Sequence, residues 1–310
     1  LRGADVVLHN FRVGVAERLG IDEETVAALN PRAVHCHASA FGSSGPRARF
    51  PGNDALMQAL TGFERAIGGE GNDPTAATWI PIDMTGGWVA AAGILAGLHA
   101  RATTGQGQRV TTSLLGAGML LHSGVFLRDG EVVRGPALDG DQTGFGPGYR
   151  LYEAADGRWL ALVVPDDAAW GRLRSLVPEL PAAYTPLAGR PGADEAAAAL
   201  AAAFVGDTAE VWVDRLQAAS VPAVVAAVLT RDEFRRRILA DPERVASYET
   251  ADWGHFEQIG PLIRCGPGTG GGPELMLPGV GEHTVEVLTE LGFDVDTVDA
   301  LLAAKVARQQ

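Results

Sequence analysis

Short apolar runs alternate with amphipathic segments along the first 130 residues of the chain. Two of the runs, DVVLHN (5–10) and AVHCHAS (33–39), have the length and composition of buried strands. The segments VGVAERLG and IDEETVAALNP between them predict two short helices, the second with acidic residues in its first turn and Pro31 at its end. Residues 53–63 and 79–100 predict two further helices, and GQGQRVTTSLL turns through glycines into a third strand. This repeated alternation predicts a largely parallel α/β sheet with helices on both faces.

The pattern changes from about Gly140 onward. Two β runs, YRLYEA and RWLALVV, are joined by an Ala-Asp-Gly turn, and this arrangement predicts a hairpin. The helical segments DEAAAALAAAFVG and TAEVWVDRLQAA and the strand PAVVAAV follow. We therefore expect a second, smaller α+β domain. The last segment predicts two short amphipathic helices around GFDVD.

Composition and charge narrow the range of partners. With 310 residues, of which 46% are hydrophobic, the chain is long enough for two domains with sizeable cores. Its 25 basic and 38 acidic residues give a formal net charge of −13, and no strongly basic block is present. Nucleic acid and anionic membrane surfaces are therefore poor candidate partners. Any anionic ligand must be held by local arginines and backbone amides.

The cysteines do not indicate a metal site or a disulfide framework. Cys36 and Cys265 stand far apart in the sequence and lack the CxxC spacing of a zinc site. Cys36 lies in the alternating stretch AVHCHAS, where we expect a small buried thiol rather than a metal ligand or a catalytic group. No metal site is predicted elsewhere, because the histidines also lack metal-ligand spacing.

The sequence predicts a cytoplasmic protein with no membrane partner. No signal peptide is visible, and no charge-free run of about 18 apolar residues fits a membrane span. The apolar helix after Asp83 comes closest, but its Gly and Ala content and the polar Thr85 are more typical of a tightly packed core. The chain starts at Leu1, without methionine, shortly before a buried strand. Since domains rarely begin so abruptly, we expect the complete protein to have residues upstream.

Asp83 is the only carboxylate in the stretch WIPIDMTGGWVAAAGILAGLHA, residues 79–100. A carboxylate beside so apolar a segment is costly unless something stabilises its charge. One interpretation is a helix N-cap, since Asp is among the best residues at that position and a helix follows. The other is a nucleophile that the same amides keep ionised. In that case Gly86 and Gly87 would let a ligand approach the backbone closely.

Three further features are weaker signals. The loop FGSSGP (41–46) has small residues that could present backbone amides, although most such loops are only turns. The segment TGFGPGY (143–149) is either a hairpin connector or a mobile lid. Arg12 and Arg18, near the end of the first predicted strand, could bind phosphate or could be solvated surface arginines.

The order of these pieces along the chain resembles the family III CoA-transferases, the CaiB/BaiF group. The likeness spans nearly the whole chain, in the family's order, and rests on the runs ADVVLHNFRVGVAERLGI, NPRAVHCHASAFGSSGP, PGNDALMQALTG, PIDMTGGWVAAAGILAGL, TGQGQRVTTSLL, YRLYEAADGRWLAL and LPGVGEHTVEVLTELGF. The group includes formyl-CoA and carnitine-CoA transferases and 2-methylacyl-CoA racemases. The resemblance implies interlocked homodimers, in which each chain threads through the other.

The resemblance also implies a division into parts. A Rossmann-like large domain would occupy residues 1–130, a small α+β domain residues 140–250, and helices that return to the large domain residues 276–310. Members of the family begin with a strand and helices upstream of the ADVVLHN run. This implies a missing segment of two βα units, each of roughly 30 residues.

Roles for individual residues follow from the same resemblance. Asp83 matches the catalytic aspartate, which helix-end amides would keep ionised. The positions that match CoA-binding segments of the family are Asn10, Phe11, Arg12, Arg18, Gly52, Asn53 and Asp54. Amides near Gly86 and Gly87 would stabilise oxyanions, each such donor contributing about 3 kcal/mol. Gly144 and Gly146 lie where some transferases carry a loop that covers the intermediate.

The resemblance therefore implies a CoA-transferase that moves CoA from an acyl-CoA to a carboxylic acid through an aspartyl-CoA thioester. Acyl-CoA would be a substrate, and no cofactor would be bound permanently. Asn53 is a departure, because it stands where the racemases have His. Racemisation needs two proton-transfer groups, and Asn has no usable pKa for this. A 2-methylacyl-CoA racemase or epimerase, and a non-catalytic acyl-CoA-binding protein, are the alternatives.

Overall fold

The chain divides into two compact units, Leu1–Ala226 and Ala227–Gln310, and each is described by itself. The computed structural model describes residues 1–228, 230, 232–233, 236, 245–250, 254–260, 263 and 278–309. Cys265 and the predicted domain boundary at residue 276 lie outside these described residues.

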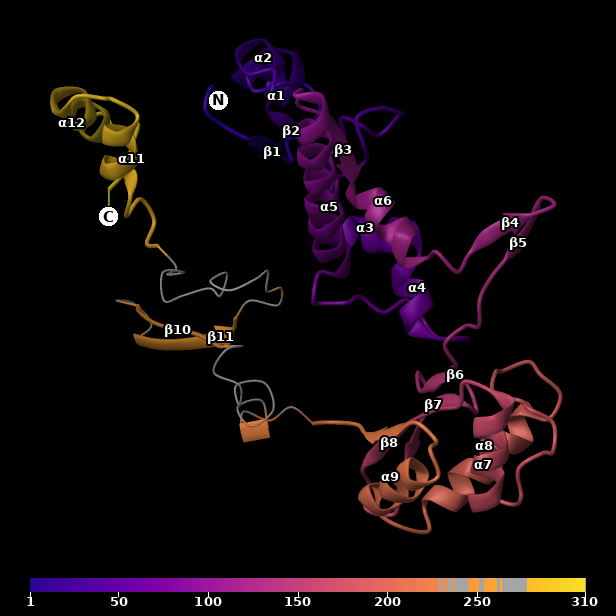
Figure 1. The fold of residues 1–310 in the computed structure, drawn as a ribbon. Coiled ribbons are helices and arrows are strands. Elements are labelled where there is room, and N and C mark those ends of the chain that lie inside the picture. The colour runs from indigo at the N-terminus through magenta and orange to yellow at the C-terminus, as the bar shows by residue number, and fades with distance from the viewer. Residues whose placement is uncertain are drawn as a thin grey trace. The chain divides into compact units, whose positions relative to one another are not determined.

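Three parallel strands form the first sheet, in the order β1-β2-β3 (Figure 1). They are β1 (Val6–His9), β2 (Val34–Ser39) and β3 (Arg109–Ser113). The central strand β2 pairs with both neighbours, so that Leu8, Cys36 and Val110 lie side by side. Val34 and Cys36 are fully buried. These observations confirm the parallel sheet and the buried thiol that the sequence predicts.

Helices occupy both connections of this sheet. The connection from β1 to β2 contains α1 (Val15–Leu19) and α2 (Glu23–Leu29). The connection from β2 to β3 contains α3 (Asp54–Thr61), α4 (Phe63–Gly68) and α5 (Pro81–Thr104), and α6 (Leu114–Leu121) follows β3. Met57 of α3, Ile82 of α5 and Ala117 of α6 form a small buried cluster that joins these three helices.

A face of small residues lets α5 lie close against the sheet, where it contacts β2 and β3. A Cβ added at Gly93 would lie 2.7 Å from a methyl group of Val110, and one at Gly97 would lie 3.0 Å from Val34. Glycine is therefore needed where helix and sheet come closest. By length and composition α5 could also cross a membrane, but this face is already packed against the sheet.

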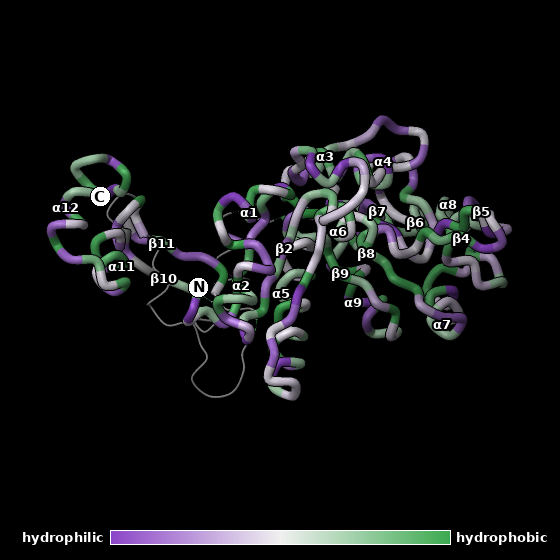
Figure 2. Tube along the Cα trace, turned by 90° about the horizontal axis from the view of Figure 1, so that it is seen from above, coloured by the Kyte–Doolittle hydropathy of each residue, from purple (hydrophilic) through white to green (hydrophobic). Residues whose placement is uncertain are grey.

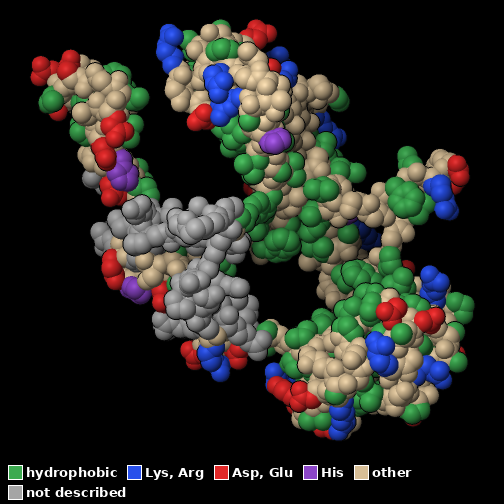
Figure 3. Space-filling view, in the orientation of Figure 1, with side chains coloured by type: hydrophobic (Ala, Val, Ile, Leu, Met, Phe, Trp, Pro, Cys, Tyr) green, Lys and Arg blue, Asp and Glu red, His purple; other side chains and the backbone are tan. Residues whose placement is uncertain are grey.

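The opposite face of α5 is exposed, which corrects the expectation of a tightly packed core helix. Met84, Trp88 and Leu95 are 52%, 56% and 66% exposed. Figure 3 shows hydrophobic side chains gathered over α5 and the elements beside it. Contiguous apolar surface of this kind commonly marks an interaction site.

An antiparallel sheet with its own core follows in the first unit. Its strands, in order, are β6 (Gly144–Gly146), β7 (Tyr149–Glu153), β8 (Trp159–Val163) and β9 (Ala223–Val225). They pack with α7 (Asp167–Leu176), α8 (Ala193–Phe204) and α9 (Ala209–Ala218). Leu160, Trp170 and Phe204 are buried in this core, and β8 is mostly hydrophobic in Figure 2. The β7–β8 hairpin and the α+β composition agree with the sequence prediction.

The hairpin of β4 (Phe126–Arg128) and β5 (Glu131–Val133) was not predicted. Its turn consists of Asp129 and Gly130, which both have positive φ angles, of 54° and 84°. Two positive φ angles are typical of a type I′ turn, which matches the twist of a hairpin, and Asp-Gly is a preferred pair for it. The Asp129-Gly130 dipeptide is therefore the feature of the sequence that indicates this hairpin.

The second unit contains a hairpin and two helices among its described residues. They are β10 (Val245–Thr250), β11 (Gly254–Ile259), α11 (Thr284–Glu290) and α12 (Val295–Ala303). The two helices confirm the amphipathic pattern around GFDVD. Asp294 caps α12 by accepting a 2.8 Å hydrogen bond from the N–H of Thr297. The hairpin was not predicted, and the return of the helices to the large domain stays a prediction.

Candidate active site

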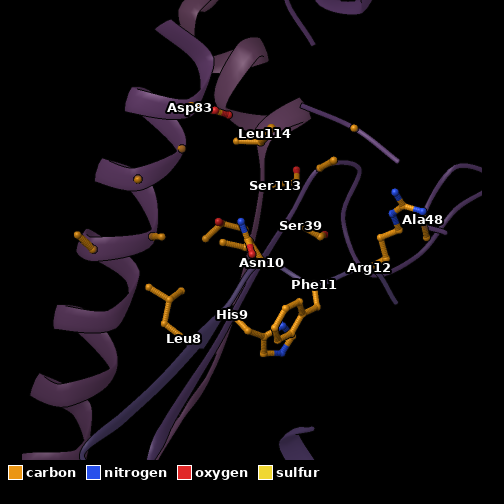
Figure 4. A pocket seen from close by; sticks show the side chains of 18 of the residues that line it. Leu8, His9, Asn10, Phe11, Arg12, Ser39, Ala48, Asp83, Ser113 and Leu114 are labelled. Atoms are coloured by element: carbon orange, nitrogen blue, oxygen red, sulfur yellow. The ribbon is translucent and has the colours of Figure 1, made fainter. Parts of the chain in front are cut away.

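A pocket of about 630 Å³ lies at the carboxyl ends of the parallel strands (Figure 4). Asn10 directly follows β1, Ser39 ends β2 and Ser113 ends β3, and all three residues line the pocket. The first turns of α5 line it as well, including Asp83 and Gly86. In open α/β sheets ligands bind at this edge of the strands, so the fold itself favours this pocket as the functional site.

Asp83 lies in the first turn of α5, with its carboxylate exposed. Figure 4 shows the side chain pointing from the helix toward Leu114. The carboxylate accepts no hydrogen bond from the part of the chain that the structure describes. A carboxylate that is exposed in a pocket and free of protein partners is available to a ligand.

Asp83 is not the N-cap of α5, so the capping interpretation is wrong. The N-cap position belongs to Ile80, whose side chain cannot accept a hydrogen bond. The cap is supplied instead by Asp54 of α3, whose Oδ2 accepts the N–H of Ile82 at 2.8 Å and the N–H of Asp83 at 2.9 Å. Helix termini leave such N–H groups unpaired, and a distant carboxylate satisfies them here.

The first-turn amides therefore do not keep Asp83 ionised in the way the sequence suggested, because Asp54 occupies them. Although the Asp83 side chain is exposed, the surrounding pocket wall partly desolvates it; this partial desolvation raises the pKa of Asp83 above its ordinary value, and the negative charge of Asp54 raises it further. Both effects disfavour the charged form. Asp83 consequently holds its proton to a higher pH than a solvated aspartate, and is a stronger base once ionised.

The segment after β1 borders the pocket, since Asn10, Phe11 and Arg12 all line it, and their predicted contact with CoA stays a prediction. The guanidinium of Arg12 makes no hydrogen bond or ion pair with the described residues, and it lies beside Ala48 in Figure 4. Arg18 lies in α1 outside the pocket lining and donates to the carbonyl of Gly14 at 3.1 Å. Arg12 is therefore the better placed of the two arginines for an anionic ligand.

Only one of three adjacent residues predicted to bind CoA reaches the pocket. Gly52 lines it. Asn53 is the N-cap of α3, and its side-chain oxygen accepts the N–H of Leu56 at 3.1 Å. Asp54 is only 5% exposed and holds the start of α5. Asn53 and Asp54 therefore each hold a helix terminus, Asn53 that of α3 and Asp54 that of α5, and neither lines the pocket.

The predicted glycines occupy regular elements. Gly86 and Gly87 line the pocket from within α5, where backbone N–H groups are taken up by the helix, so the geometry does not favour the predicted oxyanion role for their amides. Their contribution is the absence of side chains beside Asp83.

Gly144 and Gly146 lie in β6, buried and paired with β7, rather than in an open loop, and neither lines the pocket.

The sequence patterns missed two polar residues in the pocket wall, His9 and Thr112. His9 is 7% exposed, and neither ring nitrogen has a hydrogen-bond partner among the described residues. Its ring stacks on Phe11 and His37 at centroid distances of 5.6 and 4.6 Å. Burial lowers the pKa of His9, and the neighbouring histidines lower it further. The Thr112 hydroxyl is likewise buried without a described partner.

A second pocket of about 320 Å³ adjoins the first, because both are lined by His9 and Arg12. The two cavities together offer room for an elongated ligand. Within the described residues, no group of three or more His, Cys, Asp or Glu side chains is arranged to hold a metal ion.

Comparisons with known proteins give one family. A sequence profile described as CoA-transferase family III matches residues 1–284. The acetyl-CoA:oxalate CoA-transferase of Acetobacter aceti is 31% identical over 157 residues, which cover 50% of this chain and 40% of that protein. The human alpha-methylacyl-CoA racemase is 29% identical over 313 residues, which cover 98% of this chain and 78% of the racemase.

The fold is shared with solved structures. A CAIB/BAIF family protein from Brucella suis superposes with a TM-score of 0.67 at 24% identity, covering 94% of this chain and 76% of that one. The chain spans less than two thirds of some relatives, namely 40% of the Acetobacter enzyme and 66% of an acyl-CoA transferase from Fusarium pseudograminearum, which is 28% identical over 96% of this chain.

Proposed function

The chain belongs to CoA-transferase family III, and from this premise we propose that it moves CoA from an acyl-CoA to a carboxylic acid with Asp83 as the nucleophile. The observation that carries the proposal is the Asp83 carboxylate, which is exposed in the pocket at the strand ends and has no described hydrogen-bond donor. The acyl-CoA and the acid are substrates in this proposal, and no permanently bound cofactor takes part.

The reaction would proceed through two forms of covalently modified Asp83. A carboxylate oxygen attacks the carbonyl of the acyl-CoA and expels CoA thiolate, which leaves a mixed anhydride. The thiolate then attacks the Asp83 carbonyl, releases the donor acid and leaves an aspartyl-CoA thioester. The acceptor acid attacks this thioester, and the released thiolate attacks the acyl carbonyl of the new anhydride. The product acyl-CoA forms and the Asp83 carboxylate is restored.

The pocket lining suggests how the substrate is held. The unpaired guanidinium of Arg12 suits a phosphate of CoA, with Asn10, Phe11 and Gly52 beside it. Gly87, which has nothing within 4 Å of an added Cβ, leaves open space in the pocket for the thioester carbonyl. Since Asp54 occupies the amides of the first turn, we assign oxyanion stabilisation to hydroxyl groups of the pocket lining.

A racemase is the second candidate, because the relatives that match nearly the whole chain include an alpha-methylacyl-CoA racemase. Two features weigh against it. The side chain of Asn53 is engaged as a helix cap, and His9, the histidine of the pocket lining, lies across the pocket from Asp83 in Figure 4. Exchange of the α-proton for deuterium without an acceptor acid would identify racemisation.

We also propose that the protein is a cytoplasmic homodimer. The exposed apolar face of α5, with Trp88 and Leu95 at its surface, supports a second copy as the partner that covers it. The chain's relatives are longer than the chain, so all of these proposals concern the complete protein.

The proposed function is tested by incubating the full-length protein with a panel of acyl-CoAs and carboxylic acids. New CoA esters are then identified by mass spectrometry. We expect transfer by the wild-type protein and none by Asp83→Ala. Substantial transfer by a folded Asp83→Ala variant would remove Asp83 from the proposed role.

A further inference from the structure

Asp54 and Asp83 are two carboxylates held next to each other by the same helix terminus. Asp54 Oδ2 accepts the N–H of Asp83 itself and that of Ile82, at 2.9 and 2.8 Å. Asp54 is 5% exposed and belongs to α3, whereas Asp83 belongs to α5. A buried carboxylate is therefore bonded to the backbone of the residue that carries the reactive one.

Asp54 caps the start of α5, and the N-cap residue Ile80 supplies no side-chain hydrogen bond of its own. Pro81 has no N–H, and the N–H of Met84 is already bonded to the carbonyl of Ile80. This leaves the N–H groups of Ile82 and Asp83, and both donate to Asp54. Ile80 has φ 49° and ψ 54°, a left-handed conformation that is strained for a β-branched residue. The surrounding contacts must hold it there.

Gln58 fixes Asp54 in turn. Gln58 is 2% exposed, and its Nε2 donates to the other oxygen of the Asp54 carboxylate. The same amide group donates to the carbonyl of Ala77 at 2.9 Å and accepts the N–H of Ala77 at 3.0 Å. Asp54 and Gln58, one turn apart on α3, therefore clamp the backbone just before α5 and the first turn of α5 together.

We propose that Asp54 is a positioning residue for the reaction: it fixes the turn that carries Asp83 and keeps a second negative charge beside the reactive carboxylate. The repulsion acts only while Asp83 is ionised. Asp83 carries no charge in the mixed anhydride or the aspartyl-CoA thioester, so forming either one relieves it. Asp54 thereby favours the covalent intermediates over the free carboxylate.

The raised pKa of Asp83, caused by burial and by Asp54, agrees with this geometry. The other titratable groups of the pocket lining are His9 and Arg12, and both lie across the pocket from Asp83 in Figure 4. Asp54 is consequently the charged group that a substitution can remove with the most direct effect on Asp83.

The first test is independent of activity. The protein is labelled with ¹³C at the aspartate carboxyl carbons, and the Asp83 resonance is identified by its absence in Asp83→Asn and titrated by NMR. Asp54→Asn keeps an oxygen that can accept the two N–H groups but removes the charge. Asp166→Asn is the matched control, because Asp166 caps α7 by accepting the N–H of Ala169 at 2.7 Å and lies outside the pocket lining.

We expect Asp54→Asn to lower the pKa of Asp83 and Asp166→Asn to leave it unchanged. An unchanged or raised pKa in folded Asp54→Asn would overturn the proposal. If Asp54→Asn does not fold, Asp54→Ser carries the same expectation with a hydroxyl as the cap.

The second test rests on the proposed function. The fraction of protein carrying aspartyl-CoA after mixing with acyl-CoA should fall several-fold in Asp54→Asn and stay unchanged in Asp166→Asn. An equal or larger fraction in Asp54→Asn would contradict the proposal. If the wild-type protein forms no such adduct, the proposed function fails, while the titration still decides whether Asp54 acts on Asp83.

Discussion

Leu114 occupies the space that a side chain on Gly86 would need: a Cβ built on Gly86 would lie 2.8 Å from Leu114 Cδ2. Both residues line the pocket, Gly86 from α5 and Leu114 from the start of α6. The next residue, Gly87, has nothing within 4 Å of its added Cβ. Two adjacent glycines of one helix therefore differ in steric surroundings, and this difference can be measured.

Gly87→Ala should stabilise the protein, because alanine favours a helix over glycine by about 1 kcal/mol and meets no obstacle here. Gly86→Ala gains the same helix propensity but must displace Leu114, so it should be less stable than Gly87→Ala by roughly 1–2 kcal/mol. Thermal unfolding of the two variants measures the difference. Equal stability, or a more stable Gly86→Ala, would show that the packing of Leu114 against α5 is not tight.

Arg12 should matter more for CoA binding than Arg18. Arg12 lines both pockets without a described partner, whereas Arg18 is bonded to Gly14 outside them. Loss of a charge-assisted bond to phosphate costs about 1.5–3 kcal/mol, so Arg12→Ala should weaken CoA affinity by roughly 10- to 100-fold. Calorimetric titration with CoA measures this, with Arg18→Ala as the matched control. A larger loss with Arg18→Ala would reverse the assignment.

Asp83 should destabilise the folded protein at neutral pH. Its pKa is raised in the fold by burial and by Asp54, so folding favours the protonated form, and the stability present at low pH is lost as pH rises through the folded pKa. Asp83→Asn has no such titration. It should therefore be more stable than wild type at pH 7, with an advantage that shrinks as pH falls through the pKa of Asp83.

Denaturant unfolding of wild type and Asp83→Asn between pH 3 and 8 measures this dependence. An Asp83→Asn variant that is less stable than wild type at pH 7 would contradict the raised pKa. A difference that stays constant over the whole range would also contradict it. The same experiment shows whether the variant folds, which every activity test of Asp83 requires.

The apolar face of α5 should hold two copies of the full-length protein together. Trp88→Glu places a charge on that face and should convert dimers into monomers, because burying an unpaired carboxylate is costly. Val205→Glu is the matched control, since Val205 follows α8 and is as exposed as Trp88, at 56%. Light scattering after size-exclusion chromatography gives the mass. A monomeric wild type, or a dimeric Trp88→Glu, would contradict the proposal.

The sequence predicted the elements that local pattern determines. The alternation of strands and helices along the chain was enough to predict the parallel sheet. Cys36 lies in a run of alternating apolar and polar residues, and this pattern predicted its burial in β2. Asp83 stood out because it is the one carboxylate of an apolar stretch, and the resemblance to a family supplied its role. The structure then brought it to the carboxyl edge of the sheet.

The cap of α5 could not be predicted from local pattern. Asp83 looked like the cap because Asp is a good N-cap, but the helix begins two residues earlier and takes its cap from Asp54, 29 residues away. A contact over that separation depends on how α3 packs against α5. The loop predicted at Gly144 and Gly146 is a strand for a related reason. Glycine has low strand propensity, and only pairing with β7 makes that segment a strand.

The central claim is that CoA becomes covalently attached to Asp83 during the reaction. Trapping this aspartyl-CoA thioester with hydroxylamine tests the claim most directly. The full-length protein is mixed with an acyl-CoA that supports transfer, treated with hydroxylamine, digested and analysed by mass spectrometry. We predict an aspartyl hydroxamate on the peptide that contains Asp83, formed only when acyl-CoA is present and absent in Asp83→Asn. Transfer activity without a hydroxamate at Asp83, or with a hydroxamate on another carboxylate, would contradict the account.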